Sequence, residues 1–162
     1  MKMAGALLII SVCTGIGLLM AQRSKNVYRL LEEICSALEI LKSEIGFSGT
    51  DLASAFKRVD KMTDTEGIFG RAAMKIEDNG ISRAWQESVD ESSLSAENKS
   101  MLKLLCTKLG KTDTQGQLRH IEYVEELIKG RAEKARAVYE KNGRIYRGAG
   151  FLVGAAAVLL LI

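Results

Sequence analysis

The sequence predicts an all-α protein, an antiparallel bundle of about six helices flanked by two transmembrane helices. Two uncharged apolar segments lie towards the two ends of the 162-residue chain. Between them, apolar side chains recur at helical spacing, and no segment alternates as a strand would over a useful length. Proline is absent, so glycines and capping residues must end the helices.

The two apolar segments have lengths that suit a bilayer. Residues 3–21 carry no charge and would form a helix of roughly 28 Å, against a hydrocarbon thickness of ~30 Å. Residues 148–162 are also uncharged and would reach roughly 22 Å, which Ile145 and Tyr146 can extend if Arg147 snorkels to the headgroups. We therefore expect transmembrane helices over 3–21 and 148–162 and a helical domain over 22–147.

A cleavable signal peptide is the alternative interpretation of the first segment. Lys2 alone would form its basic region, and Leu19-Met20-Ala21 is a poor cleavage site. Positive charge follows the segment at once, which resists translocation. These features favour a membrane span.

Charge is distributed unevenly around the net value of +3. Basic residues dominate 22–29 and 129–147, whereas acidic residues outnumber basic ones in 30–128. Because Lys and Arg near span ends mark the cytoplasmic side, we expect a cell-membrane protein with its middle domain in the cytoplasm. The basic flanks also suit an anionic lipid surface.

The first helix of the domain is predicted over about residues 24–45, where Gly46 ends it. It continues directly from the first span, because Gln22-Arg23 contains no breaker. Its apolar stripe consists of Val27, Leu30, Leu31, Ile34, Leu38, Leu41 and Ile45.

Five further helices follow. The second covers about residues 51–61 with Ser48 or Thr50 as cap, the third follows a capping-box pattern at 63–66, and Asn79-Gly80 ends it. The fourth covers about 82–91, and the fifth runs from Ser95 to Gly110. The last starts at the capping-box pattern of residues 112–115 and meets no strong breaker before the second span.

No recognisable catalytic, cofactor-binding or metal site is present in the sequence. Gly110-Lys111-Thr112 resembles the end of a phosphate loop, but Leu105 stands where a further glycine is required. The single histidine, His120, has no partners at catalytic or metal-ligand spacing, so a structural role is expected. No aromatic residues interleave with a basic patch, which argues against nucleic-acid binding. We expect reduced thiols at Cys13, Cys35 and Cys106.

Small residues recur within the predicted spans. Gly150 and Gly154 have the spacing that permits close contact between helices, and Ser11, Gly15 and Gly17 offer a matching face on the first span. The two spans are expected to pair, and use of the same residues in oligomerisation is the alternative.

Several short motifs follow one another along the chain. Gly49 leads to Leu52-x-x-Ala55-Phe56, and Gly80 leads to Ala84-Trp85, a weak internal echo that similar helix-turn geometry can explain. Leu109-Gly110, Gln117-x-x-His120-Ile121 and Tyr146-Arg147 come next. In this order, and with its terminal apolar segments, the chain resembles the stage III sporulation protein AB family over almost its whole length.

The resemblance implies a place in the mother-cell membrane of endospore-forming bacteria, in the channel complex that connects mother cell and forespore. It also implies a domain similar to that of the inner-membrane platform protein of type II secretion and type IV pilus systems. Such a platform would link a cytoplasmic secretion-type ATPase, the AA subunit, to other stage III channel subunits. Platform proteins usually carry two such domains, so this chain would need to form a homo-oligomer.

We therefore expect a non-enzymatic scaffold that docks the ATPase. The alternatives are a passive assembly factor, which holds other subunits through its spans, and a membrane-anchored enzyme or sensor. Because complementary charge aids docking, carboxylates of the negative body are the candidate docking residues: Asp90, Glu91, Glu122, Glu125 and Glu126.

Overall fold

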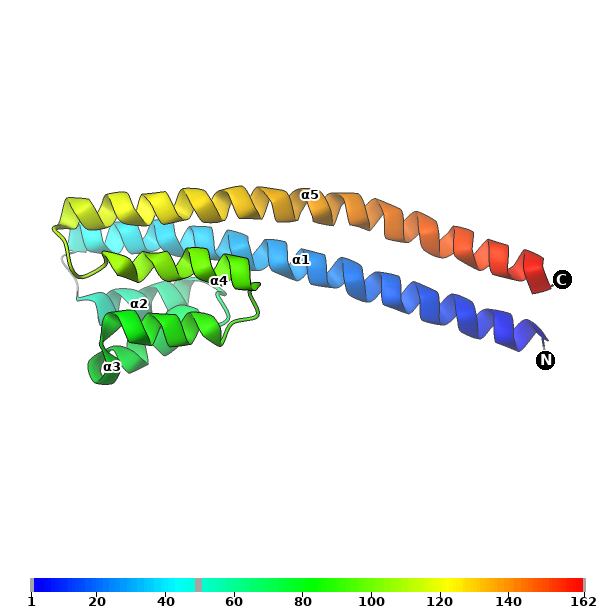
Figure 1. The fold of residues 1–162 in the computed structure, drawn as a ribbon, viewed down its shortest axis with the longest axis horizontal. Coiled ribbons are helices and arrows are strands. Elements are labelled where there is room, and N and C mark those ends of the chain that lie inside the picture. Colours follow the sequence, from blue (N-terminus) through cyan, green and yellow to red (C-terminus); the bar gives the residue numbers. More distant parts are fainter. Residues whose placement is uncertain (1, 49–50, 162) are drawn as a thin grey trace. The chain divides into compact units, whose positions relative to one another are not determined.

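A computed structural model describes the backbone of residues 2–48 and 51–161, together with the side chains of residues 15, 19–47 and 51–141. Throughout these ranges the regular structure is helical, which confirms the predicted all-α class (Figure 1). The elements are α1 (Lys2–Ser48), α2 (Leu52–Met62), α3 (Ile68–Asp90), α4 (Ala96–Lys103), the 3-10 helix η1 (Leu104–Thr107) and α5 (Thr114–Leu161).

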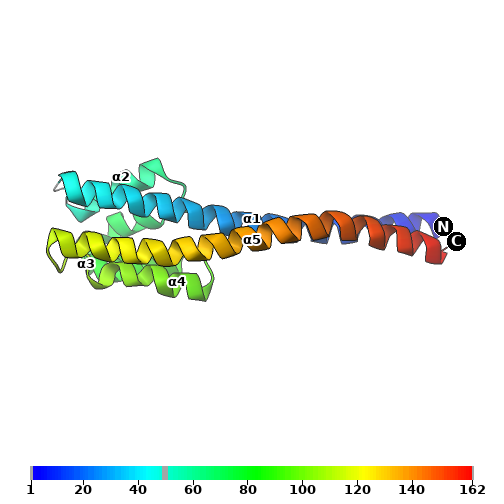
Figure 2. The same cartoon turned by 90° about the horizontal axis from the view of Figure 1, so that it is seen from above.

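The chain divides into two units. One comprises residues 29–132, and the other comprises residues 1–28 with 133–162. Within the first unit, the end of α1 lies beside the start of α5, as both views show (Figures 1 and 2). The Lys42 ammonium reaches the Glu125 carboxylate across this pair, at 2.6 Å. In the second unit, the rings of Tyr28 and Tyr139 stack with centroids 6.3 Å apart.

The end of α1 buries one apolar stripe. The predicted positions from Leu30 to Ile45 are buried, as the helical period requires. Val27 differs from the other predicted positions of the stripe: it is 42 % exposed and lies outside the 29–132 unit. The helix also continues two residues beyond Gly46, to Ser48.

Capping residues differ from the predicted ones. Asp51, rather than Ser48 or Thr50, begins α2: its carboxylate accepts a hydrogen bond from the Ser54 N–H at 3.0 Å. The hydrogen bond from Ser54 lowers the pKa of Asp51. At the start of α3 the capping box of residues 63–66 is not formed, because Gly67 takes the cap position in a left-handed conformation.

The predicted third and fourth helices are the two halves of α3, which Gly80 separates. The φ of 71° and ψ of 158° at Gly80 are non-helical, and the chain folds back there, so that Arg71 and Lys75 of the first half reach Glu91 of the second. The six predicted helices therefore correspond to the five α-helices of the described residues, with α3 counted as two. The structure thus confirms the predicted helix stop at Asn79-Gly80.

Three aromatic rings form the centre of the 29–132 unit. Phe56 comes from α2, Phe69 from the first half of α3 and Trp85 from the second, and all three are fully buried. Their centroids are 5.0–5.3 Å apart, in tilted and edge-to-face arrangements. The Trp85 indole N–H donates to the Leu102 carbonyl of α4 at 2.9 Å. The Ala-aromatic pairs of the internal echo, Ala55-Phe56 and Ala84-Trp85, thus meet in one core.

The predicted spans form the outer parts of α1 and α5, and both helices are continuous. Of the residues that the structure describes, no helix contains a stretch that is both long enough and apolar enough to cross a membrane. Nearly all side chains of 3–21 and all those of 148–162 lie outside the described residues, Gly150 and Gly154 included. The transmembrane part of the prediction is therefore untested.

Two glycines make a matched test of this backbone. Gly80→Ala should lower the free energy of unfolding by about 1–3 kcal/mol, because its φ and ψ lie in a region that is essentially restricted to glycine. Gly130 has ordinary helical geometry within α5 and open space around its Cα, so Gly130→Ala should raise stability by about 0.5–1 kcal/mol. Urea denaturation of the two variants followed by circular dichroism tests the difference. Equal effects would contradict a strained backbone at Gly80.

Candidate functional site

The turn between η1 and α5 is closed by its own side chains. The Gln117 side chain accepts a hydrogen bond from the Gly110 N–H at 3.2 Å and donates one to the Thr112 carbonyl at 2.9 Å. Gly110 has φ +72°, and a Cβ added there would lie 3.1 Å from a methyl of Leu52. Asp113, rather than Thr112, caps α5, accepting from the Gly116 N–H at 3.3 Å. These contacts give the motif residues Gly110 and Gln117 a positioning role in the turn.

His120 joins α5 to η1. Its Nε2 lies 2.7 Å from the Leu104 carbonyl and 3.1 Å from the Thr107 hydroxyl. Since a carbonyl can only accept, Nε2 carries the proton in this arrangement. The described residues contain no group of three or more His, Cys, Asp or Glu side chains that could hold a metal ion.

A cleft of about 550 Å³ opens beside this turn. Its lining includes Lys108, Asp113, Arg119, His120 and Tyr123. The Tyr123 ring stacks on His120 with centroids 6.3 Å apart, and its residue is 53 % exposed. Among the described side chains, none forms an ion pair with Lys108 or Arg119. The cleft therefore combines an aromatic surface with one acidic side chain and two cations that form no ion pair with a described side chain.

The five predicted docking carboxylates differ in their surroundings: some form ion pairs within the fold, and others are exposed without one. Asp90 binds Lys103 at 2.6 Å, and Glu125 is largely buried against Lys42. Glu122 and Glu126 are exposed on α5, and no described residue forms an ion pair with either.

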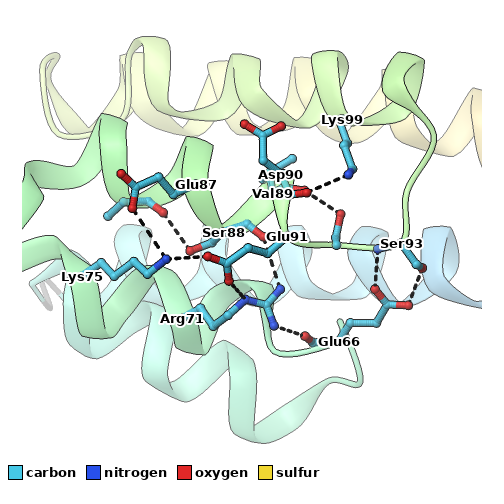
Figure 3. A network of polar contacts seen from close by, with 12 residues as sticks. Glu66, Arg71, Lys75, Glu87, Ser88, Val89, Asp90, Glu91, Ser93 and Lys99 are labelled. Atoms are coloured by element: carbon cyan, nitrogen blue, oxygen red, sulfur yellow. Dashed lines mark hydrogen bonds and ion pairs between the residues drawn. The ribbon is translucent and has the colours of Figure 1, made fainter.

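The fifth of these carboxylates, Glu91, lies in a polar network between the two halves of α3 (Figure 3). It accepts from Lys75 at 2.8 Å and from Arg71 at 3.1 Å. Arg71 also donates to the Glu66 and Ser88 carbonyls, at 2.6 and 3.2 Å. The hydrogen bond from Lys75 lowers the pKa of Glu91 and raises the pKa of Lys75.

Glu66 extends the network to the loop after α3. Its carboxylate accepts from the backbone N–H and from the hydroxyl of Ser93, at 2.9 and 2.5 Å (Figure 3). The predicted capping box had assigned this side chain to its own helix start. It instead joins two loops that are 27 residues apart in the sequence.

The two cysteines with described side chains are free thiols. Burial raises the pKa of the Cys35 thiol to about 11, and the pKa of the fully enclosed Cys106 thiol rises further. Both thiols are therefore protonated at neutral pH, which disfavours the nucleophilic thiolate. The side chain of Cys13 lies outside the described residues.

Comparison with known proteins agrees with this arrangement. The model of the family described as stage III sporulation protein AB matches residues 2–162. The chain belongs to the stage III sporulation protein AB family. Stage III sporulation protein AB of Bacillus subtilis (strain 168) is 26 % identical over 170 aligned positions, which cover 100 % of this chain and 99 % of the relative.

The family is also represented among solved structures. A structure of stage III sporulation protein AB (SpoIIIAB) superposes with a TM-score of 0.64 at 21 % identity. The similarity covers 71 % of this chain and 97 % of the solved one. It shows a shared fold, and the family assignment connects the chain with sporulation.

The motif residues of this sporulation protein fall into two groups. Ala55, Phe56, Ala84, Trp85 and Ile121 are buried core, and Leu52, Gly80, Gly110, Gln117 and His120 shape turns or contact them. Gly49 and the side chain of Tyr146 lie outside the described residues. The cleft residues Lys108, Arg119 and Tyr123 were not predicted, although two cations and an aromatic residue flanking one turn are a readable signal.

The ion pairs of Glu91 predict a pH-dependent stability. A lowered carboxylate pKa stabilises the fold above the ordinary value of 4.5, and this contribution is lost as the pH falls below it. Glu91→Gln should therefore be less stable than the unaltered protein at pH 7, and the difference should shrink in acid. Urea midpoints at pH 7 and below pH 4.5 measure this. A difference that is independent of pH would contradict the ionic role of Glu91.

Proposed function

We propose that this protein is a non-enzymatic membrane scaffold of the sporulation channel complex, which docks a cytoplasmic secretion-type ATPase. Family membership supports the sporulation role. The observation that carries the docking role is the outer face of α5, where Arg119, Glu122, Tyr123 and Glu126 recur at helical spacing and are exposed. This face ends at the cleft beside the η1–α5 turn.

The arrangement supports docking because these charges are not used within the fold. Elsewhere in the 29–132 unit, many charged side chains form internal ion pairs, such as Arg58 with Glu44 and Lys75 with Glu91. Charged groups without internal partners can pair with a second protein without first breaking a contact. Complementary charge then fixes the orientation of the partner.

We further propose that residues 3–21 and 148–162 anchor the scaffold in the cell membrane, with the 29–132 unit on the cytoplasmic side. The basic flanks at 22–29 and 129–147 support this orientation. A full platform would then be formed by several copies of the chain, in contact with other stage III channel subunits.

The topology predicts the behaviour of the chain in membranes. The full-length protein should remain in the membrane fraction after alkaline extraction, because two apolar spans hold it there. Its 29–132 unit should be digested by protease added to inverted membrane vesicles and protected in right-side-out vesicles. Release by alkali, or the opposite protection pattern, would contradict the proposed anchoring or its orientation.

The docking role predicts that the full-length chain in lipid nanodiscs binds the purified AA-type ATPase saturably. Replacing Glu122 and Glu126 by Lys should raise the Kd about tenfold, equivalent to ~1.4 kcal/mol, because two exposed carboxylates become repulsive cations. Glu77→Lys with Asp78→Lys is the matched control, since both are exposed acids on α3. Biolayer interferometry at several salt concentrations measures the change.

The possible results separate the alternatives. No binding by the unaltered chain would contradict ATPase docking and favour a passive assembly factor. Equal weakening by the α5 variant and by the α3 control would show that net charge alone matters, and would exclude the outer face of α5 as the docking surface.

A further inference from the structure

The cleft beside the η1–α5 turn contains cations that the fold does not use. In the surrounding unit, most cations near α3 and α4 are paired: Lys103 binds Asp90, Arg71 binds Glu91 and Arg131 binds Glu97. Lys108 and Arg119 form no such pair with any described side chain, although both line the cleft. The carboxylate of Asp113 also lines it and accepts the Gly116 N–H as the cap of α5, so two cationic side chains and one acidic side chain line the cleft.

The cleft also has a preformed aromatic wall. His120 is held by the Leu104 carbonyl and the Thr107 hydroxyl, so its ring is fixed against η1. Tyr123 stacks on that ring while half of its own surface stays exposed. Tyr and Arg are enriched among residues that dominate binding energy at protein interfaces. A rigid aromatic surface beside two cations suits a ligand with both an apolar part and a negative charge.

The neighbouring charges decide which class of anion fits. Beyond Arg119, the same face of α5 presents Glu122 and Glu126, both exposed. A polyanion that covered this face, such as a nucleic acid or an anionic bilayer, would meet these carboxylates and be repelled. A folded protein can place a single acidic side chain in the cleft and different groups opposite the two glutamates.

We propose that this cleft receives an acidic side chain of a protein partner, whose carboxylate pairs with Lys108 and Arg119 and whose apolar portion lies on Tyr123. The inference rests on the proposed scaffold function, because it takes the docked ATPase as that partner. It assigns to the cleft the anchoring contact of the interface, and to Glu122 and Glu126 the flanking contacts.

Charge reversal in the cleft tests the proposal. The full-length chain in nanodiscs of zwitterionic lipid is titrated with the AA-type ATPase, and Lys108→Glu/Arg119→Glu is compared with the unaltered chain. The Kd should rise at least about tenfold, because the carboxylate would face two like charges. Tyr123→Ala should also weaken binding. Lys57→Glu/Lys61→Glu is the matched control, with two exposed cations of α2 that form no described ion pair, and should change the Kd less than about twofold.

The outcomes distinguish the cleft assignment from the proposed scaffold function. Binding by the unaltered chain that survives Lys108→Glu/Arg119→Glu, with circular dichroism unchanged, would overturn the cleft assignment and leave the scaffold function standing. Absence of binding by the unaltered chain would overturn both. If the double reversal unfolds the chain, Lys108→Gln/Arg119→Gln replaces it, with a smaller increase in Kd and a weaker salt dependence expected. An unchanged Kd and salt dependence in that variant would overturn the assignment equally.

Discussion

The buried contact of Phe56, Phe69 and Trp85 is the constraint on which the 29–132 unit depends. Each ring comes from a different helical segment, and the indole N–H adds a fourth by binding the Leu102 carbonyl. If the Leu102 carbonyl were misplaced, the buried Trp85 indole N–H would lose its partner, which is destabilising by about 1–3 kcal/mol. The connecting turns must therefore hold the helices that carry these rings in fixed positions, and polar side chains fix those turns.

The sequence was sufficient for what depends on helical period. The buried stripe of α1 and the interruption at Gly80 are both local properties. Helix caps were predicted less well, because adjacent polar residues compete for one position. Ser48, Thr50 and Asp51 all qualify by type, and the described cap is the one immediately before the first helical residue.

The ion pairs and the cleft of the candidate site could not be predicted from the sequence. Net acidity of the domain identified carboxylates, but it could not show that Asp90, Glu91 and Glu125 were already bound by Lys103, Lys75 and Lys42. Those pairs join residues that only the tertiary fold brings together. The cleft has the same origin, because it exists only where η1 packs on the start of α5. The Lys108 and Arg119 charges were visible in the sequence, whereas their lack of partners was not.

The order of charge along the exposed face of α5 has a geometric consequence. From the turn outwards, that face presents Arg119, then Glu122 and Glu126, then Lys129. Since the signs change along the helix, a complementary surface matches them in one register. Sliding a partner by one turn would bring like charges together. In a ring of identical copies, such a face would hold every attached subunit in the same register along α5.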